Sequence, residues 1–321
     1  MPKTLKLVLA AVAVLLVVFL LLPSGARDTN PDFPESAEIV IDGVRLHYRV
    51  WTPDGPSKAN VLLVHGLGGS TFSWRYTAPH LAAQGYTTVS VDLPGFGYSD
   101  RARGLDHSQQ NRSRLLWKLL DHVDSQLVNN PEGPQIWNLV GHSMGGGTIT
   151  AMAHSRPEHT RSLAYAAGSV FRQPPRSAGF LFRIPVISSL LAHLARFFLL
   201  TENRITDTLT SAYGRTPTAD EITGYLAPLK LPGTETALLD ITSSQGEPVE
   251  TYLPHIQAPA LLIWGAEDTW VPLSEGEQLA AALPQAELHS IPGSSHCPME
   301  THPEIFNKLL TDFLKQVPSE T

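Results

Sequence analysis

The chain has 321 residues, 42% of them hydrophobic, and contains no low-complexity tract. A chain of this length can bury one substantial core with a modest insertion, so two independent domains are not required. Its 23 basic and 30 acidic residues give a net charge of −7 without a basic cluster, which argues against nucleic acid as a partner. Cys297 is the only cysteine, so neither an internal disulfide nor a CxxC metal site can form.

The N-terminus carries a strongly apolar segment. Leu7 to Leu22 is a run of sixteen apolar residues, preceded by Lys3 and Lys6 and followed by Pro23-Ser24-Gly25-Ala26. We expect residues 1–27 to be a membrane anchor, with the rest of the chain on the outer, periplasmic or extracellular, face. The small residues that follow the run leave open a second possibility, a cleaved signal peptide and a secreted protein.

After a linker at residues 28–36, strand and helix patterns alternate along the chain. Asp42-Gly43 between two short runs predicts a tight hairpin. The predicted strands are Ala37–Ile41, Val44–Trp51, Asn60–His65, Thr87–Asp92, Ile136–Gly141, Arg161–Ala167, Ala260–Gly265 and Ala286–Ile291. The predicted helices lie near Trp74–Ala83, Ser108–Val128, Met144–His154 and Pro303–Gln316. Such alternation predicts an α/β fold with a mostly parallel sheet between two layers of helices.

This alternation stops between residues 169 and 254. Prolines punctuate the stretch, and helical patterns occupy Phe180–Leu200, Thr218–Leu226 and Thr234–Ser243. We therefore expect a core built from residues 37–168 and 255–321, with a helical insertion between them.

Three short motifs hold residues that are suited to nucleophilic catalysis. Gly141-His142-Ser143-Met144-Gly145 is a GxSxG pentapeptide between a predicted strand and a predicted helix, which places Ser143 on a sharp turn. Asp268 follows the strand at 260–265, and His296 follows the strand at 286–291. Ligands of such sheets bind at the carboxyl ends of the strands, where all three side chains are expected to lie.

The order serine, aspartate, histidine resembles that of the α/β-hydrolases. Two further motifs add to the resemblance: His65-Gly66-Leu67-Gly68-Gly69, which is similar to the family's oxyanion loop, and Asp92-Leu93-Pro94-Gly95-Phe96-Gly97-Tyr98-Ser99 after the following strand. The resemblance implies a mostly parallel eight-stranded sheet with a helical cap at residues 169–254.

The resemblance also implies roles for particular residues. Ser143 would be the nucleophile, His296 the general base and Asp268 the acid that orients it. The backbone N–H groups of Leu67 and Met144 would form the oxyanion hole, with Gly68 as the alternative to Leu67. No cofactor is implied. His65 and His142 belong to the loop motifs, and without an HExxH motif or clustered carboxylates nearby we expect no metal site.

Several reactions remain open within the resemblance. A serine nucleophile argues against haloalkane dehalogenases and epoxide hydrolases, which use a carboxylate. C–C bond hydrolases share the serine triad, but their usual motifs have Asn before the serine, Gly-Pro-Gly in the oxyanion loop and Gly-His-Trp at the histidine. This chain has His142, Gly68-Gly69-Ser70 and Ser295-His296-Cys297 at those places.

We therefore expect a carboxylesterase or lipase-like enzyme that cleaves a small, apolar carboxylic ester through an acyl-enzyme intermediate. The first alternative is a C–C bond hydrolase of the same fold. The second is a non-catalytic binding protein on that fold.

Overall fold

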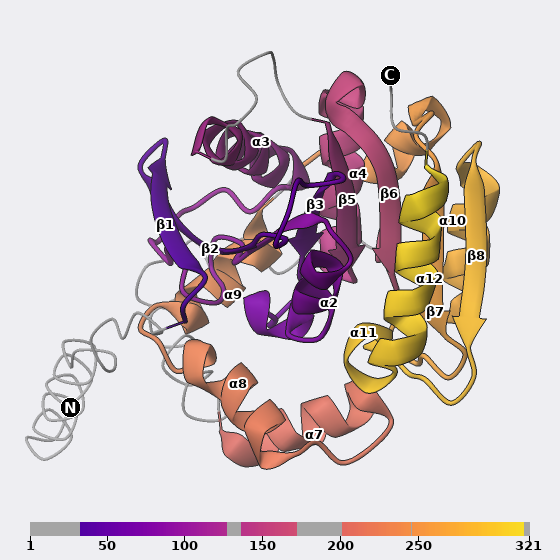
Figure 1. Cartoon of the computed structure of the whole chain (residues 1–321). Helices are drawn as coiled ribbons and strands as arrows, with labels where there is room; N and C mark the ends of the chain where they lie inside the picture. The colour runs from indigo at the N-terminus through magenta and orange to yellow at the C-terminus, as the bar shows by residue number, and fades with distance from the viewer. Residues whose placement is uncertain (1–32, 127–135, 172–200, 245, 318–321) are drawn as a thin grey trace, which may run out of the picture.

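The computed structural model describes residues 33–126, 136–171, 201–244 and 246–317 (Figure 1). An eight-stranded sheet lies at its centre, with the strand order β1-β2-β4-β3-β5-β6-β7-β8. The first two strands pair antiparallel, as do β2 and β4, and all other neighbours are parallel. The strands are β1 (Ser36–Ile41), β2 (Val44–Trp51), β3 (Asn60–Val64), β4 (Thr87–Val91), β5 (Trp137–His142), β6 (Thr160–Ala166), β7 (Ala260–Gly265) and β8 (Ala286–Ile291). The predicted fold class is confirmed.

Alternation along the central strands divides the core into two layers. In β3, Leu62 and Val64 face one hydrophobic cluster, whereas Val61 and Leu63 face the other. Successive side chains of a strand point to opposite faces, so a strand that is apolar throughout is covered on both sides. This is the burial that a mostly parallel sheet requires.

Helices supply the two covering layers. The cluster on one face includes residues of α3 (Gln109–Gln126), α4 (Met144–Ser155) and α10 (Leu273–Ala282). The cluster on the other face includes residues of α2 (Thr77–Ala83) and α12 (Pro303–Gln316). The short elements are η1 (Thr71–Trp74), η2 (Pro157–His159), η3 (Val249–His255) and α11 (Pro298–Thr301).

Three further helices lie between β6 and β7 in the chain: α7 (Glu202–Tyr213), α8 (Ala219–Leu229) and α9 (Thr234–Ser243). Figure 1 shows α7 and α8 at the bottom of the view, the side to which the arrowhead of β8 points. The side chain of Thr201 caps α7 and that of Thr218 caps α8. These caps satisfy backbone N–H groups at the helix starts. The helices at 219–229 and 234–243 match the predicted pattern, whereas α7 was not predicted and the predicted helix at Phe180–Leu200 lies outside the described residues.

The predicted membrane-anchored location needs correction. In the described part of the chain, no helix combines the length and apolar character needed to cross a bilayer. The longest helix there, α3, has 18 residues and carries Arg114, Lys118 and Asp121, and charged groups are costly in lipid. The predicted anchor, Leu7 to Leu22, lies outside the described residues. The location on the outer face of a membrane is therefore not retained.

Candidate active site

Ser143 occupies the sharp turn between β5 and α4. Its backbone has φ 49° and ψ −119°, in a region that residues with a Cβ rarely adopt. The Ser143 N–H donates to Ala166 O at 3.1 Å, and its carbonyl oxygen accepts from the N–H groups of Gly146 and Ser169, both at 2.8 Å. These bonds hold the strained turn in place.

A glycine in the first turn of α4, Gly145, allows this turn to approach the sheet closely. A Cβ on Gly145 would lie 2.4 Å from Val64 O of β3. No side chain fits at that distance, so the close packing of α4 against β3 requires a glycine at the last position of the pentapeptide.

Asp268 and His296 form a buried pair at the ends of β7 and β8. Asp268 Oδ2 lies 2.8 Å from His296 Nδ1, and the two side chains are 0% and 4% exposed. Asp268 Oδ1 accepts from the backbone N–H groups of Trp270 and Val271 at 2.8 and 2.9 Å. The carboxylate is thus fixed by two donors, and its second oxygen accepts the Nδ1 proton of His296. That tautomer leaves Nε2 of His296 as the basic nitrogen.

The backbone of His296 is held from two sides. Its N–H donates to Ala212 O of α7 at 2.9 Å. Its carbonyl oxygen accepts from His142 Nε2 at 3.0 Å. Burial, and secondarily the nearby His296, lower the pKa of His142 well below its usual value, so its ring is neutral. The indole of Trp270 stacks on the His296 ring, with 5.4 Å between centroids.

The predicted oxyanion loop lies against the serine turn. A Cβ on Gly66 would lie 2.9 Å from Ser143 Cβ, which brings Leu67 next to the nucleophile candidate. The buried ring of His65 holds the loop in place. Its Nδ1 donates to Gly66 O at 2.7 Å, and its Nε2 accepts from Leu93 N at 3.0 Å. Met144 is the first residue of α4, where helical N–H groups have no intrahelical partner.

Asp92, in the second loop motif, is a structural residue. Its buried carboxylate accepts from Thr71 N at 2.6 Å and Tyr98 N at 2.8 Å, and it lies 2.7 Å from His47 Nδ1. Burial alone would raise its pKa, but the hydrogen bond and charge of His47 lower it overall. This carboxylate orders the loop that carries the motif.

A pocket of about 330 Å³ opens at the serine turn. Ser143 and His296 both line it, together with the loop residues Gly66, Leu67, Gly68 and Gly69. Most of the other lining residues are apolar and come from the helices between β6 and β7 and from the loop after β7; they include Ile205, Leu209, Ala212, Leu229, Leu238, Trp270 and Val271. Cys297 also lines the pocket, and burial raises the pKa of its thiol well above the usual value. This thiol is therefore protonated and unreactive.

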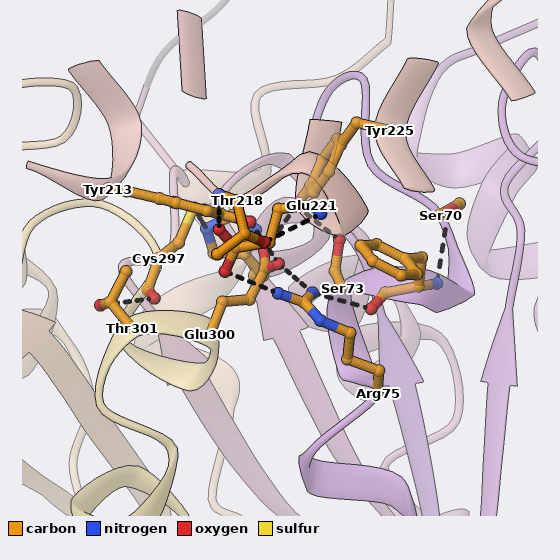
Figure 2. A network of polar contacts seen from close by, with 12 residues as sticks. Ser70, Ser73, Arg75, Tyr213, Thr218, Glu221, Tyr225, Cys297, Glu300 and Thr301 are labelled. Atoms are coloured by element: carbon orange, nitrogen blue, oxygen red, sulfur yellow. Dashed lines mark hydrogen bonds and ion pairs between the residues drawn. The ribbon is translucent and has the colours of Figure 1, made fainter. Parts of the chain in front are cut away.

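A buried polar network adjoins one side of the pocket (Figure 2). Glu300 of α11 pairs with Arg75 and accepts from Tyr213 Oη at 2.7 Å and Tyr225 Oη at 2.5 Å. Burial raises the pKa of Glu300, while the charge of Arg75 and the hydrogen bonds from these neighbours oppose the rise. The network joins the core to α7 and α8, and sequence reasoning missed it.

A second carboxylate, Glu221 of α8, extends this network toward solvent. It accepts from Arg215 Nη1 at 2.9 Å and from Thr218 N at 2.7 Å. Arg75 Nη2 also lies 3.3 Å from Glu221 Oε1. The Thr-x-x-Glu capping box of α8 was the local sequence signal for this part of the network.

No group of three or more possible metal ligands occurs among residues 33–126, 136–171, 201–244 and 246–317. His65 and His142, the two histidines of the loop motifs, both bond backbone groups instead.

Comparison with known proteins places this chain in a family. A family model of the alpha/beta hydrolase fold matches residues 59–303. The chain is 30% identical over 284 residues to an uncharacterized hydrolase, YugF, of Bacillus subtilis, which covers 86% of this chain and 96% of the relative. It is also 30% identical over 289 residues to a 2-hydroxy-6-oxononadienedioate/2-hydroxy-6-oxononatrienedioate hydrolase of Paraburkholderia phymatum, covering 85% and 92% of the two chains.

A solved structure shares the fold at lower identity. It is that of a membrane phospholipase A described as a bacterial virulence factor, with a TM-score of 0.70, 21% identity and coverage of 97% of this chain and 92% of that one. The present chain belongs to the alpha/beta hydrolase fold family and is a hydrolase.

Proposed function

We propose that the chain is a serine hydrolase that cleaves carboxylic esters through an acyl-enzyme intermediate. The observation that carries the proposal is the buried Asp268–His296 pair, 2.8 Å apart, at the same pocket as the strained Ser143 turn. A serine, a histidine and an aspartate placed in this way can form a catalytic triad, in which the histidine activates the serine hydroxyl for attack on a carbonyl.

Each residue then has a defined step. Ser143 Oγ attacks the ester carbonyl while His296 Nε2 takes its proton, and Asp268 stabilises the imidazolium. The N–H groups of Leu67 and Met144 receive the oxyanion of the tetrahedral intermediate. His296 returns the proton to the leaving alcohol, and a water molecule activated by the same nitrogen releases the acid from Ser143.

The pocket lining supports an apolar group on the substrate. Among the described lining residues there is no lysine or arginine that could pair with a substrate carboxylate. Leu209, Leu229 and Ile205 instead offer apolar surface, whose burial against an acyl or alkyl group is favourable by about 25 cal/mol per Å². A neutral ester with an apolar chain suits this wall.

The test is hydrolysis of nitrophenyl butyrate together with fluorophosphonate labelling. Ser143→Ala should abolish labelling and lower kcat by a factor of about 10⁶. Ser125→Ala, which removes an exposed serine hydroxyl of α3, is the matched control and should behave as wild type. Hydrolysis that persists unchanged in Ser143→Ala would refute the proposal, and a well-folded wild type that neither labels nor hydrolyses would point to a non-catalytic binding protein.

A second candidate is hydrolysis of a C–C bond, which the curated relatives favour. Several of them, at 28 to 30% identity, are named as 2-hydroxy-6-oxononadienedioate hydrolases. The same triad candidates would serve that reaction, but the substrate of those relatives is a dianion. Comparing kcat/KM for such a dienedioate with that for nitrophenyl butyrate separates the candidates, since the ester hydrolase should prefer the ester and the C–C hydrolase the dienedioate.

A further inference from the structure

Two hydroxyl groups on the pocket wall are joined to a buried carboxylate. Tyr225 Oη donates to Glu300 Oε1 at 2.5 Å, and Ser73 Oγ lies 3.0 Å from Tyr225 Oη. Figure 2 shows Ser73 between the Tyr225 side chain and the Arg75 and Glu300 side of the network. Both Ser73 and Tyr225 line the pocket that contains Ser143.

The number of protons fixes the direction of this chain of hydrogen bonds. A tyrosine hydroxyl has a single proton, and Tyr225 gives it to Glu300. The Ser73 hydroxyl must therefore be the donor in its bond to Tyr225. With its only proton committed, Ser73 Oγ can offer the pocket lone pairs but no donor.

Surrounding contacts hold this arrangement in place. The guanidinium of Arg75 pairs with Glu300 from the side of the core, and this favours the ionised, accepting form of the carboxyl group. The Phe72 ring packs edge-on against Tyr225, with 5.9 Å between centroids, and orients the phenol. Ser73 itself is 1% exposed, so little water competes for its oxygen.

We propose that Ser73 is a specificity-determining residue that accepts a hydrogen bond from a substrate hydroxyl group, a role that rests on the proposed ester hydrolysis. The substrate class is then a carboxylic ester that carries a free hydroxyl in addition to the ester and is otherwise apolar. Leu209 and Leu229, which line the same pocket, provide no acceptor from their side chains. A hydroxyl buried against them unpaired would cost about 1–3 kcal/mol, and a hydrogen bond to Ser73 Oγ would remove that cost.

The kinetic test uses ester pairs that differ only in the donor. One pair is glycerol monobutyrate and its dimethyl ether; the other is nitrophenyl 6-hydroxyhexanoate and its 6-methoxy analogue. The ether oxygens can accept but cannot donate. Wild type should prefer the hydroxyl member of at least one pair by about tenfold in kcat/KM, which corresponds to about 1.4 kcal/mol.

Variants assign the preference to the chain of hydrogen bonds. In Ser73→Ala the ratio of hydroxyl to methoxy substrate should fall to about one, and Ser73→Thr, which keeps the hydroxyl, should restore it. Tyr225→Phe should lower the ratio because the Ser73 proton becomes free to turn into the pocket. Thr210→Ala, which removes an exposed hydroxyl of α7, should keep the wild-type ratio. Equal rates for both members of both pairs in wild type, or a preference that survives Ser73→Ala, would overturn the inference.

A binding measurement separates this inference from the proposed function. In the Ser143→Ala background, calorimetry should show tighter binding of 1,6-hexanediol than of 1,6-dimethoxyhexane, and the added Ser73→Ala change should remove the difference. If wild type hydrolyses no ester, the proposed function fails while this comparison still decides the role of Ser73. If esters are hydrolysed but the two probes bind equally in the Ser143→Ala protein, the role of Ser73 fails alone.

Discussion

The Nε2 atom of His142 donates a hydrogen bond to the backbone carbonyl oxygen of His296, 3.0 Å away. The residue before the candidate nucleophile thus positions the backbone of the candidate base, across 154 residues of sequence. The two rings also lie close, with 4.9 Å between centroids. If both rings were protonated, their positive charges would repel each other. The neutral state of His142 avoids this repulsion.

Loss of this donor should lower both stability and activity. In His142→Phe the His296 carbonyl loses its partner, and the free energy of unfolding should fall by about 1–3 kcal/mol. His142→Gln can still donate and should be milder in denaturant melts. Because the pKa of His142 is far below its usual value, His142→Gln should have the same pH profile of kcat/KM as wild type. A His142→Phe protein as stable and active as wild type would show that the bond has no role.

Asp268→Asn should lower kcat by about 10⁴ without unfolding the protein, because an amide at this place favours the wrong tautomer of His296. Glu267→Gln is the matched control, since Glu267 is the exposed neighbour of Asp268. Steady-state kinetics and circular dichroism check both variants. Equal losses in the two proteins would refute the choice of Asp268.

Gly145→Ala should be strongly destabilising. The added Cβ would lie 2.4 Å from Val64 O, a backbone atom that cannot move without displacing β3. We expect a loss of about 1–3 kcal/mol or more in denaturant unfolding, as for other overpacked sites. Gly55→Ala is the control, because nothing lies within 4 Å of its added Cβ. That variant should stay within about 0.5 kcal/mol of wild type.

Acid should weaken the attachment of α8 through Glu221. Burial alone would raise the pKa of Glu221, but the hydrogen bonds from Arg215 and Thr218 and the nearby arginine charges outweigh it and lower the pKa from 4.5 to about 2. A lowered folded-state pKa means that the stabilisation is present above about pH 4.5 and is lost as pH falls toward 2. After allowance for the partly exposed Arg215, this amounts to about 2 kcal/mol.

Glu221→Gln should therefore be less stable than wild type at pH 7, and the difference should shrink between about pH 4.5 and 2. The pKa of Glu300 is raised, so its contribution to stability changes with pH in the opposite direction. Glu300 is present in both wild type and Glu221→Gln, and its contribution cancels in the comparison. Glu202→Gln, which removes an exposed carboxylate at the start of α7, is the control. Thermal melts at several pH values measure the difference, and a gap that is constant with pH would contradict the prediction.

The strands and the motif residues could be predicted because their signals are local. The apolar runs before Ser143, Asp268 and His296 end where β5, β7 and β8 end or one residue away. Parallel pairing then brings their carboxyl ends to one edge without any knowledge of side-chain contacts. Whether these residues catalyse the reaction stays a prediction, as does the division of the chain at residues 169 and 254.

Other parts of the site could not be predicted, because their partners are distant in sequence. Ser73 and Tyr225 are 152 residues apart, and Tyr225 and Glu300 are 75 apart. Each looks like an ordinary polar residue until α8 is placed over η1 and α11. Helix α7 was missed, although its apolar residues Ile205, Leu209, Ala212 and Tyr213 recur at helical spacing and the Thr201 cap and the left-handed Gly214 marked its ends.

The hydrogen bond from His296 N–H to Ala212 O couples the position of α7, which lines the pocket, to the backbone of the candidate base. Ala212 belongs to the same turn of α7 that lines the pocket. An outward movement of α7 would leave the His296 N–H unpaired, and of the two hydrogen bonds described for the His296 backbone only the one from His142 would remain. A ligand that fits beneath α7 therefore leaves this bond in place, whereas one that displaces the helix breaks it. The size of a bound ligand and the positioning of the candidate base are thus coupled through this peptide hydrogen bond.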